Sequence, residues 1–185
     1  MKLGIIIGST RQGRATETVA KWVTTAAKAI DKFEVSVLDL RDYPMPFFDE
    51  PMPPAYNENR QPVAEAQKWL DALATQEAFV FVTPEYNHSM PAVIKNAVDY
   101  VDTQLKGKSA LIVAHGPSSG GSEAAAHLRT ALSNTIGMSV VEPDVLMQTM
   151  VAMGGVFDEN GALVQSENDW DAQLEAGLAA LASNE

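Results

Sequence analysis

The chain has 185 residues and no cysteine, and its 13 Lys+Arg against 24 Asp+Glu give a formal net charge of −11. This length is typical of one domain with its own core, and a content of 46% hydrophobic and 20% charged residues excludes a disordered chain. The acidic balance argues against binding nucleic acid or anionic membranes. The lack of cysteine excludes disulfides, thiolate nucleophiles and iron–sulfur clusters.

The N-terminal sequence MKLGIIIGSTR has too short an apolar run for a signal peptide. No segment approaches the roughly 20 apolar residues of a membrane span. We therefore expect one domain over residues 1–185 that is located in the cytoplasm.

Short apolar runs alternate with segments of helical periodicity along the chain. We expect strands at residues 3–7, 35–40, 78–82, 110–114 and 138–141. We expect helices near residues 19–30, 63–73, 92–101, 124–132 and 170–181. Strands that are apolar throughout, such as AFVFV at 78–82, are typical of a parallel sheet covered on both faces. The order of elements predicts a three-layer, doubly wound α/β fold around five parallel strands, with the proline-rich residues 43–62 as an excursion.

Polar residues and glycines follow the first, third and fourth expected strands. These loops are GSTRQGR at residues 8–14, PEYN at 84–87 and HGPSSGGS at 115–122. The carboxyl ends of parallel strands share one edge of the sheet, and open α/β sheets bind ligands there. The sequence therefore predicts a ligand site formed by these three loops.

The first loop has the features of an anion site. It offers hydroxyls, two glycines and two arginines at the start of a helix, where free backbone N–H groups favour a phosphate. Gly8 and Gly13 have the spacing of an NTP-binding P-loop, but Arg14 and Ala15 stand where that motif has Lys and Ser/Thr. Nucleotide hydrolysis is therefore disfavoured, and the lack of G-x-G-x-x-G disfavours a dinucleotide Rossmann site.

The third loop contains Gly116-Pro-Ser-Ser-Gly120, the G-x-S-x-G pattern of a serine hydrolase. A triad would need a later acid and histidine, and His127 is the only histidine after this loop. The alternative is a loop whose glycine backbone closely approaches a flat ligand. In the second loop, Tyr86 can cover an aromatic ring and Asn87 can donate and accept hydrogen bonds, although the segment also fits a simple turn before a helix.

With these residues the sequence resembles the NADPH-dependent FMN reductase family, flavodoxin-like enzymes that include azo, quinone and chromate reductases. The resemblance rests on residues 8–14, on TPEYNHSMPAVIKNAVDY at 83–100, and on Gly120-Gly121 followed by Leu128-Arg129. It covers about residues 3–142. Departures from the family pattern are Ala92, Arg14 and Thr16, where many members have Gly, Ser and Asn.

The resemblance implies the strand order 2-1-3-4-5 and bound FMN, with NADPH or NADH as co-substrate. Ser9, Arg11, Arg14 and Thr16 would hold the phosphate. The flavin ring would be lined by Pro84, Glu85, Tyr86 and Asn87, with Ser119, Gly120 and Gly121 on its other side. Hydride would pass from the nicotinamide to the flavin and then to a small-molecule acceptor. The cofactor carries the reactive atoms, so no side chain is assigned a catalytic role.

The resemblance also implies a homodimer or homotetramer, to which Met147, Met150 and Met153 or the helix of Arg129 would contribute. An electron carrier that binds FMN but does not oxidise NAD(P)H remains an alternative. Three scattered histidines predict no metal site. Trp22, Trp69 and Trp170 fall at apolar positions of expected helices, which favours core or subunit contacts.

Overall fold

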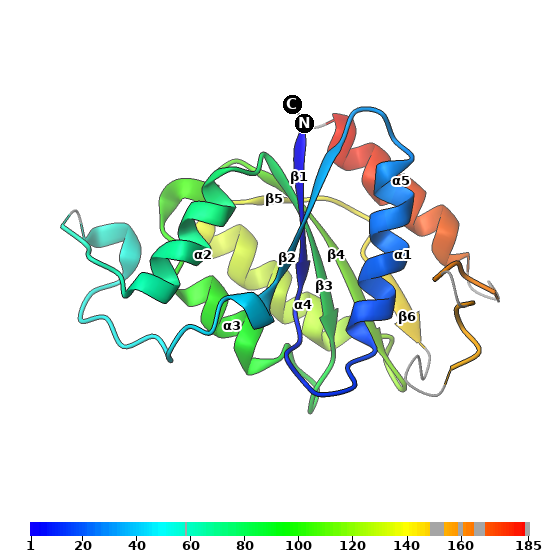
Figure 1. Cartoon of the computed structure of the whole chain (residues 1–185), viewed down its shortest axis with the longest axis horizontal. Coiled ribbons are helices and arrows are strands. Elements are labelled where there is room, and N and C mark those ends of the chain that lie inside the picture. Colours follow the sequence, from blue (N-terminus) through cyan, green and yellow to red (C-terminus); the bar gives the residue numbers. More distant parts are fainter. Residues whose placement is uncertain (58, 149–153, 159–160, 165–168, 184–185) are drawn as a thin grey trace.

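The computed structural model describes residues 1–57, 59–148, 154–158, 161–164 and 169–183. Its parallel sheet contains β1 (Lys2–Ile7), β2 (Glu34–Asp39), β3 (Ala78–Pro84), β4 (Ser109–Gly116), β5 (Ser139–Val140) and β6 (Val145–Gln148) (Figure 1). The α-helices are α1 (Thr16–Lys28), α2 (Ala64–Ala74), α3 (Ala92–Asp99), α4 (Ser122–Thr130) and α5 (Trp170–Ser183). A π-helical segment, Ala131–Ile136, extends α4.

The strand order is β2-β1-β3-β4-β5, which confirms the expected order 2-1-3-4-5. The chain moves outward from β1 to β2 and then returns to place β3 on the other side of β1. The order therefore reverses between β1 and β3, where open α/β sheets leave room for a ligand.

The fifth strand is divided, unlike the single strand expected at residues 138–141. Ser139–Val140 pairs with the start of β4, and Val145–Gln148 pairs with its end. Pro143 lies between the two segments and has no N–H to donate to the sheet. Arg129 satisfies the backbone at this break, because its guanidinium donates to the carbonyls of Val140 and Val141 at 2.9 and 3.0 Å.

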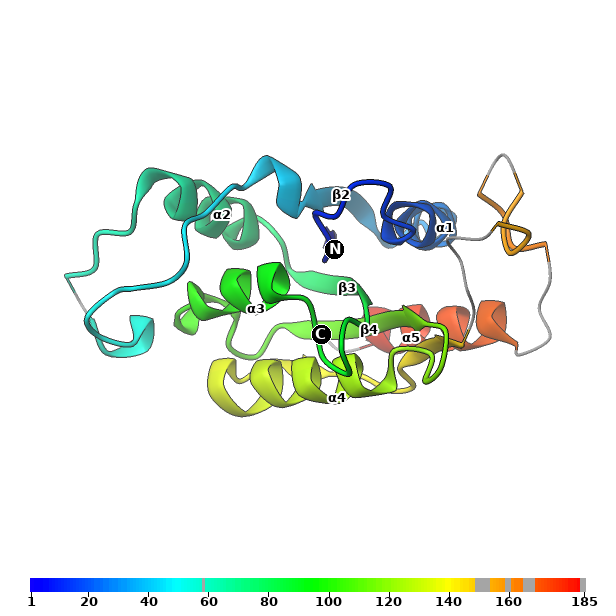
Figure 2. The same cartoon turned by 90° about the horizontal axis from the view of Figure 1, so that it is seen from below.

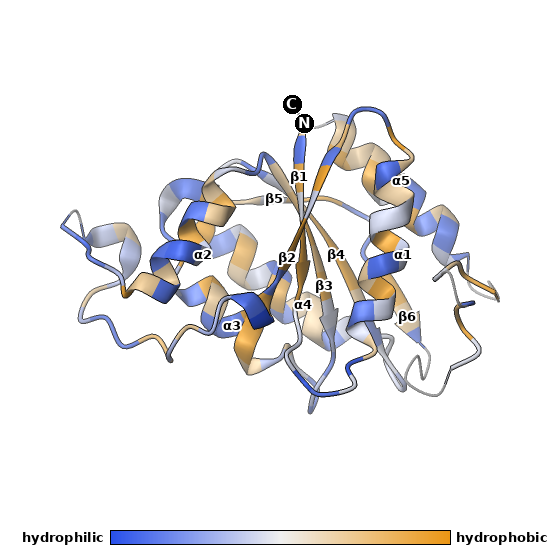
Figure 3. Ribbon diagram, in the orientation of Figure 1, coloured by the Kyte–Doolittle hydropathy of each residue, from blue (hydrophilic) through white to orange (hydrophobic). Residues whose placement is uncertain are grey.

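Two apolar cores lie on opposite faces of the sheet, as predicted for a three-layer fold. Alternation along β3 sends Val80 and Val82 into the core under α1 and α5, and Phe79 and Phe81 into the core under α2, α3 and α4. Figure 2 shows these helix groups on either side of the sheet, and Figure 3 shows the apolar strands between them. The three tryptophans expected in core or subunit contacts are buried within the chain: Trp22, Trp69 and Trp170.

The proline-rich excursion is held against α3 by two residues of the family-like segment 83–100. Asn96 accepts a hydrogen bond from the Phe48 amide at 2.9 Å and donates to the Pro46 carbonyl at 2.8 Å. The Tyr100 hydroxyl donates to the same carbonyl at 3.2 Å. Part of this motif therefore fixes the fold rather than facing a ligand. Among the helices of the described residues, none combines the length and apolarity needed to cross a membrane.

Candidate functional site

The three loops predicted to form a ligand site meet at the carboxyl edge of the sheet, at the bottom of Figure 1. The Ser9 hydroxyl of the first loop lies 2.9 Å from the Tyr86 hydroxyl of the second. The Ser119 hydroxyl of the third donates to Glu85 of the second at 2.6 Å. Side-chain hydrogen bonds therefore join all three loops.

The first loop is supported from behind by Arg14, whose side chain is only 2% exposed. Its guanidinium donates to the Ser9 carbonyl at 2.5 Å and to Asp39 Oδ1 at 2.7 Å, with a further bond to Asp39 Oδ2. The hydrogen bond with Asp39 raises the pKa of Arg14. Burial disfavours the charged form of Asp39, but hydrogen bonds from Arg14 and from the Arg41 amide outweigh this and lower its pKa. Arg14, expected at the phosphate, is thus engaged in a nearly buried ion pair.

The front of the first loop is exposed and has free donors. Thr10, Arg11, Gln12 and Gly13 are all exposed. Within the described residues, the amides of Thr10, Gln12 and Gly13 donate to no protein acceptor. Gly13 has a φ of +62°, a conformation that glycine adopts without strain. Adjacent unpartnered amides at the start of a helix fit an anion such as a phosphate.

The second loop is a tight turn with a strained backbone. Tyr86 and Ser89 exchange two backbone hydrogen bonds, of 2.9 and 3.1 Å. The two residues between them, Asn87 and His88, have φ values of 50° and 60°, which non-glycine residues rarely adopt. Both side chains are exposed, whereas Tyr86 is half-buried against Ser9. Strained turns of this kind concentrate at binding sites.

Glu85 turns away from the exposed surface of the site and binds the start of α4. Its Oε2 accepts from the amides of Glu123 and Ala124 at 3.0 and 3.3 Å, while Oε1 accepts from Ser119. Burial raises the pKa of this carboxyl, but the hydrogen bonds from Ser119 and the two amides outweigh burial and lower it. Glu85, expected to line the flavin ring, therefore connects the second loop to the third loop and α4.

The other predicted site residues also have partners within the protein. Thr16 is buried, and its hydroxyl lies 3.0 Å from His115 Nε2. Burial lowers the pKa of His115 to about 4, so the imidazole is neutral near pH 7. Pro84 is a buried residue at the end of β3. Gly120 packs against β6 and Gly121 against β4.

The structure gives no support to the serine hydrolase alternative. His127 Nδ1 bonds with the Ser89 hydroxyl at 2.9 Å, His115 bonds with Thr16, and His88 Nδ1 lies 2.9 Å from Glu123 Oε2. All three histidines of the chain thus have partners other than Ser118. Ligand atoms of Glu85, His88 and Glu123 lie within 4.8 Å of one another. The Glu85 oxygens already accept three hydrogen bonds, so the group fits an ion-pair cluster better than a metal site.

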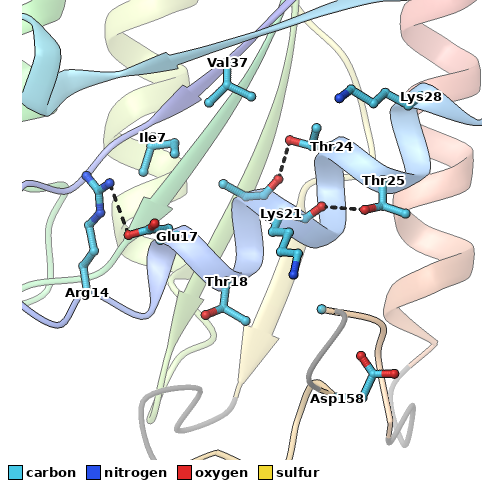
Figure 4. A pocket seen from close by; sticks show the side chains of 12 residues that line it. Ile7, Arg14, Glu17, Thr18, Lys21, Thr24, Thr25, Lys28, Val37 and Asp158 are labelled. Carbon is cyan, nitrogen blue, oxygen red and sulfur yellow. Dashed lines mark hydrogen bonds and ion pairs between the residues drawn. The ribbon is translucent and has the colours of Figure 1, made fainter.

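A cavity of about 730 Å³ lies behind the first loop, along the outer side of α1. Figure 4 shows Lys21, Thr24, Thr25 and Lys28 of α1 along it, with Arg14 at its end near the loop. A smaller cavity of about 310 Å³, lined by Thr10, Arg41 and residues of α3, lies on the other side. The first loop thus contributes Arg14 to the larger cavity and Thr10 to the smaller one.

The sequence reasoning missed three polar residues near this edge. Asp39 is the last residue of β2 and Arg41 lies two residues further on, while Gln148 ends β6, where its side-chain amide donates to the Ser118 carbonyl at 2.8 Å. Arg41 was detectable, because it directly follows the strand expected at residues 35–40, just as the three chosen loops follow theirs, whereas Asp39 falls inside that expected strand. Gln148 was not, because β6 lies outside the expected strands.

The family model of the NADPH-dependent FMN reductases matches residues 1–151, which include all three loops. The chain belongs to this family. Its relatives include an NAD(P)H-dependent FMN reductase of Nectria sp, 32% identical over 180 residues, or 95% of this chain and 89% of the relative. Another, from Schizosaccharomyces pombe, is 37% identical over 120 residues, or 65% of this chain and 60% of that protein.

Solved structures support the fold. The flavoenzyme NAD(P)H:(acceptor) oxidoreductase of Paracoccus denitrificans superposes with a TM-score of 0.78 at 20% identity, covering 99% of this chain and 96% of that one. The expectations of a flavodoxin-like fold and of an oxidoreductase are thus confirmed. The expected use of FMN together with NAD(P)H is confirmed for the family.

Of the methionines predicted to contribute to a subunit contact, Met147 is fully buried in the core of its own chain, so its side chain is not available to a second subunit. Met150 and Met153 lie outside the described residues. The side chain of Arg129 binds Val140, Val141 and Asp144 of its own chain.

Proposed function

We propose that this protein is an FMN-dependent NAD(P)H oxidoreductase that reduces a small-molecule acceptor, such as a quinone, an azo compound, a metal oxyanion or a free flavin. The observation that carries the proposal is the family match over residues 1–151, because it spans every loop of the site. When bound, FMN supplies the hydride and electron chemistry. The protein therefore has to bind FMN, orient it and leave one face accessible.

The exposed front of the first loop is the proposed phosphate site. Its unpartnered amides at Thr10, Gln12 and Gly13 can donate to phosphate oxygens, and the exposed Arg11 can add a charge-assisted hydrogen bond. Ser9 and Thr16 act from inside the fold, since Ser9 bonds with Tyr86 and Thr16 with His115.

The second and third loops are the proposed walls of the ring site. Tyr86 and Asn87 stand on one side, and Ser119, Gly120 and Gly121 on the other. Glu85 fixes the spacing between these walls through its bonds to Ser119 and to the start of α4. No side chain is assigned as a general acid or base.

The acceptor class is supported by the names of further relatives. These are a quinone reductase of Pseudomonas putida and an NADPH azoreductase of Bacillus sp.. An exposed ring face would admit the nicotinamide and the acceptor in turn, so we expect ping-pong kinetics.

The decisive test is the visible spectrum of the purified protein after FMN is added and the excess removed, followed by anaerobic titration with NADPH. Retained flavin bands that bleach with NADPH would support the proposal. Retained bands that stay unbleached with both NADPH and NADH would favour the electron carrier. No retained flavin at saturating FMN would contradict FMN as a bound cofactor.

We also propose a homodimer or homotetramer, on the basis of the family resemblance, and the cytoplasmic location expected from the sequence stays a prediction. Sedimentation equilibrium of the full chain tests the assembly. A monomer at micromolar concentration would contradict it.

A further inference from the structure

We propose that Arg14 and Arg41 are positioning residues that hold two backbone carbonyls away from the anion site, and that Asp39 holds Arg14 in place for this task. The inference rests on the proposed phosphate site in the first loop. The Arg14 guanidinium donates to the Ser9 carbonyl at 2.5 Å, and the Arg41 guanidinium donates to the Arg11 carbonyl at 2.6 Å. Two guanidinium groups thus hold the backbone of the loop at Ser9 and at Arg11, two positions apart.

Peptide geometry converts these two bonds into an orientation of the loop's donors. In a planar trans peptide, the C=O and N–H groups point in opposite directions. Binding the Ser9 carbonyl therefore directs the Thr10 amide away from Arg14, and binding the Arg11 carbonyl directs the Gln12 amide away from Arg41. These are two of the amides that have no acceptor within the described residues.

Carbonyl oxygens near a phosphate would repel it, so their direction affects affinity. A carbonyl that accepts from a guanidinium also loses part of its negative field, because charge-assisted hydrogen bonds are strong and polarising. Arg14 and Arg41 would thus favour the anion without touching it.

Asp39 connects the two arginines. Its carboxylate binds both terminal nitrogens of Arg14, and its Oδ1 accepts from the Arg41 amide at 3.0 Å. The nearly complete burial of Arg14 fits a fixed support better than a ligand-seeking cation. The Arg14 side chain lies at one end of the cavity along α1, as Figure 4 shows.

The variant Asp39→Asn separates a positioning role from direct phosphate binding, because the two roles predict opposite changes in the affinity for FMN. If Arg14 and Arg41 were phosphate ligands, removal of a nearby negative charge would strengthen FMN binding. If the two arginines position the loop, the variant loosens Arg14 and FMN binding becomes weaker. We expect the dissociation constant of FMN to rise about tenfold, the lower end of the effect of losing one hydrogen bond to a charged group. Riboflavin, which has no phosphate, should change little.

The experiment is a fluorescence titration of flavin-free protein with FMN and with riboflavin, and its readout is the ratio of the two dissociation constants. Asp144→Asn is the matched control, since Asp144 pairs with Arg129 and its side chain is 19% exposed against 21% for Asp39. This control should leave the ratio unchanged. A melting temperature for each variant establishes that it folds.

Arg41→Ala is the second variant, because Arg41 is exposed and its removal should not unfold the chain. Like Asp39→Asn, this variant should lower the preference for FMN over riboflavin. An Asp39→Asn protein that binds FMN as tightly as the wild type, or more tightly, would overturn the inference. A wild-type protein that binds neither flavin would instead contradict the proposed function.

Discussion

The two glycines of the third loop are required by contacts within the protein. Gly121 has a φ of +87°, and a Cβ there would lie 2.7 Å from the Ala114 Cβ and 2.8 Å from the His115 amide nitrogen. A Cβ on Gly120 would lie 3.0 Å from the amide nitrogen of Gln148. These glycines were expected to bring the backbone close to a flat ligand. In the structure, Gly120 allows the backbone of the third loop to approach β6, and Gly121 allows it to approach β4. Both contacts are made within the protein itself.

The substitution Gly121→Ala should therefore destabilise the protein strongly. The positive φ costs an alanine roughly 1–2 kcal/mol, and overpacking against β4 adds about 1–3 kcal/mol. Gly13→Ala is the matched control, because Gly13 has a φ of +62° but nothing within 4 Å of its Cβ position. Gly13→Ala should lower the free energy of unfolding only by the cost of the positive φ, roughly 1–2 kcal/mol. Urea unfolding without flavin measures both, and equal losses would contradict the packing argument.

His115 gives the stability a pH dependence. Burial lowers the pKa of His115 to about 4 in the folded chain, against roughly 6.5 when unfolded. Between these pH values the unfolded chain binds a proton that the folded chain does not. Lowering the pH from about 6.5 to 4 should thus reduce the free energy of unfolding, by up to about 3 kcal/mol.

The measurement is urea unfolding at several pH values in this window, for the wild type and for His115→Gln. The variant removes the titrating group while keeping a polar partner for Thr16. Its stability should fall less steeply than that of the wild type. Parallel curves would show that His115 does not titrate as its burial implies.

At the scale of elements, α4 depends on a carboxylate from another loop for its N-terminal cap. Gly121 stands at the N-cap position and has no side chain to cap the helix. Glu85 replaces it by accepting from the amides of Glu123 and Ala124. A carboxylate at a helix N-terminus also interacts favourably with the helix dipole.

Glu85→Ala should destabilise the protein by about 1–2 kcal/mol, the usual cost of a lost cap. Glu123→Ala is the control, since Glu123 lies in the first turn of the same helix but its side chain is exposed. The lowered pKa of Glu85 makes its contribution present above the unfolded pKa and lost as pH falls through the folded pKa. Thermal unfolding at pH 7 and at pH 3 measures this, and a loss equally large at both would contradict it.

At the scale of the whole molecule, the sequence was sufficient to predict the fold and the meeting of the three loops at one edge of the sheet. Apolar strands, alternation with helices and polar strand ends are local patterns, and they place the three loops on one edge. The roles of single side chains were not predictable in this way. Arg14 with Asp39, Glu85 with α4 and Thr16 with His115 each join residues 25 or more positions apart. The division of the fifth strand also depended on Pro143 and Arg129 together.

FMN should stabilise the whole domain, because a ligand that binds only the folded chain raises its unfolding free energy. At 100 times the dissociation constant, the gain is about 2.7 kcal/mol. For a chain of this size, that corresponds to a rise in melting temperature of roughly 5–11 °C. Riboflavin at the same concentration should give a smaller rise, because it cannot use the amides of the first loop. Differential scanning fluorimetry or calorimetry measures both. Equal rises in melting temperature for the two flavins would contradict a phosphate site at residues 8–14, since the affinity would then come from the ring alone.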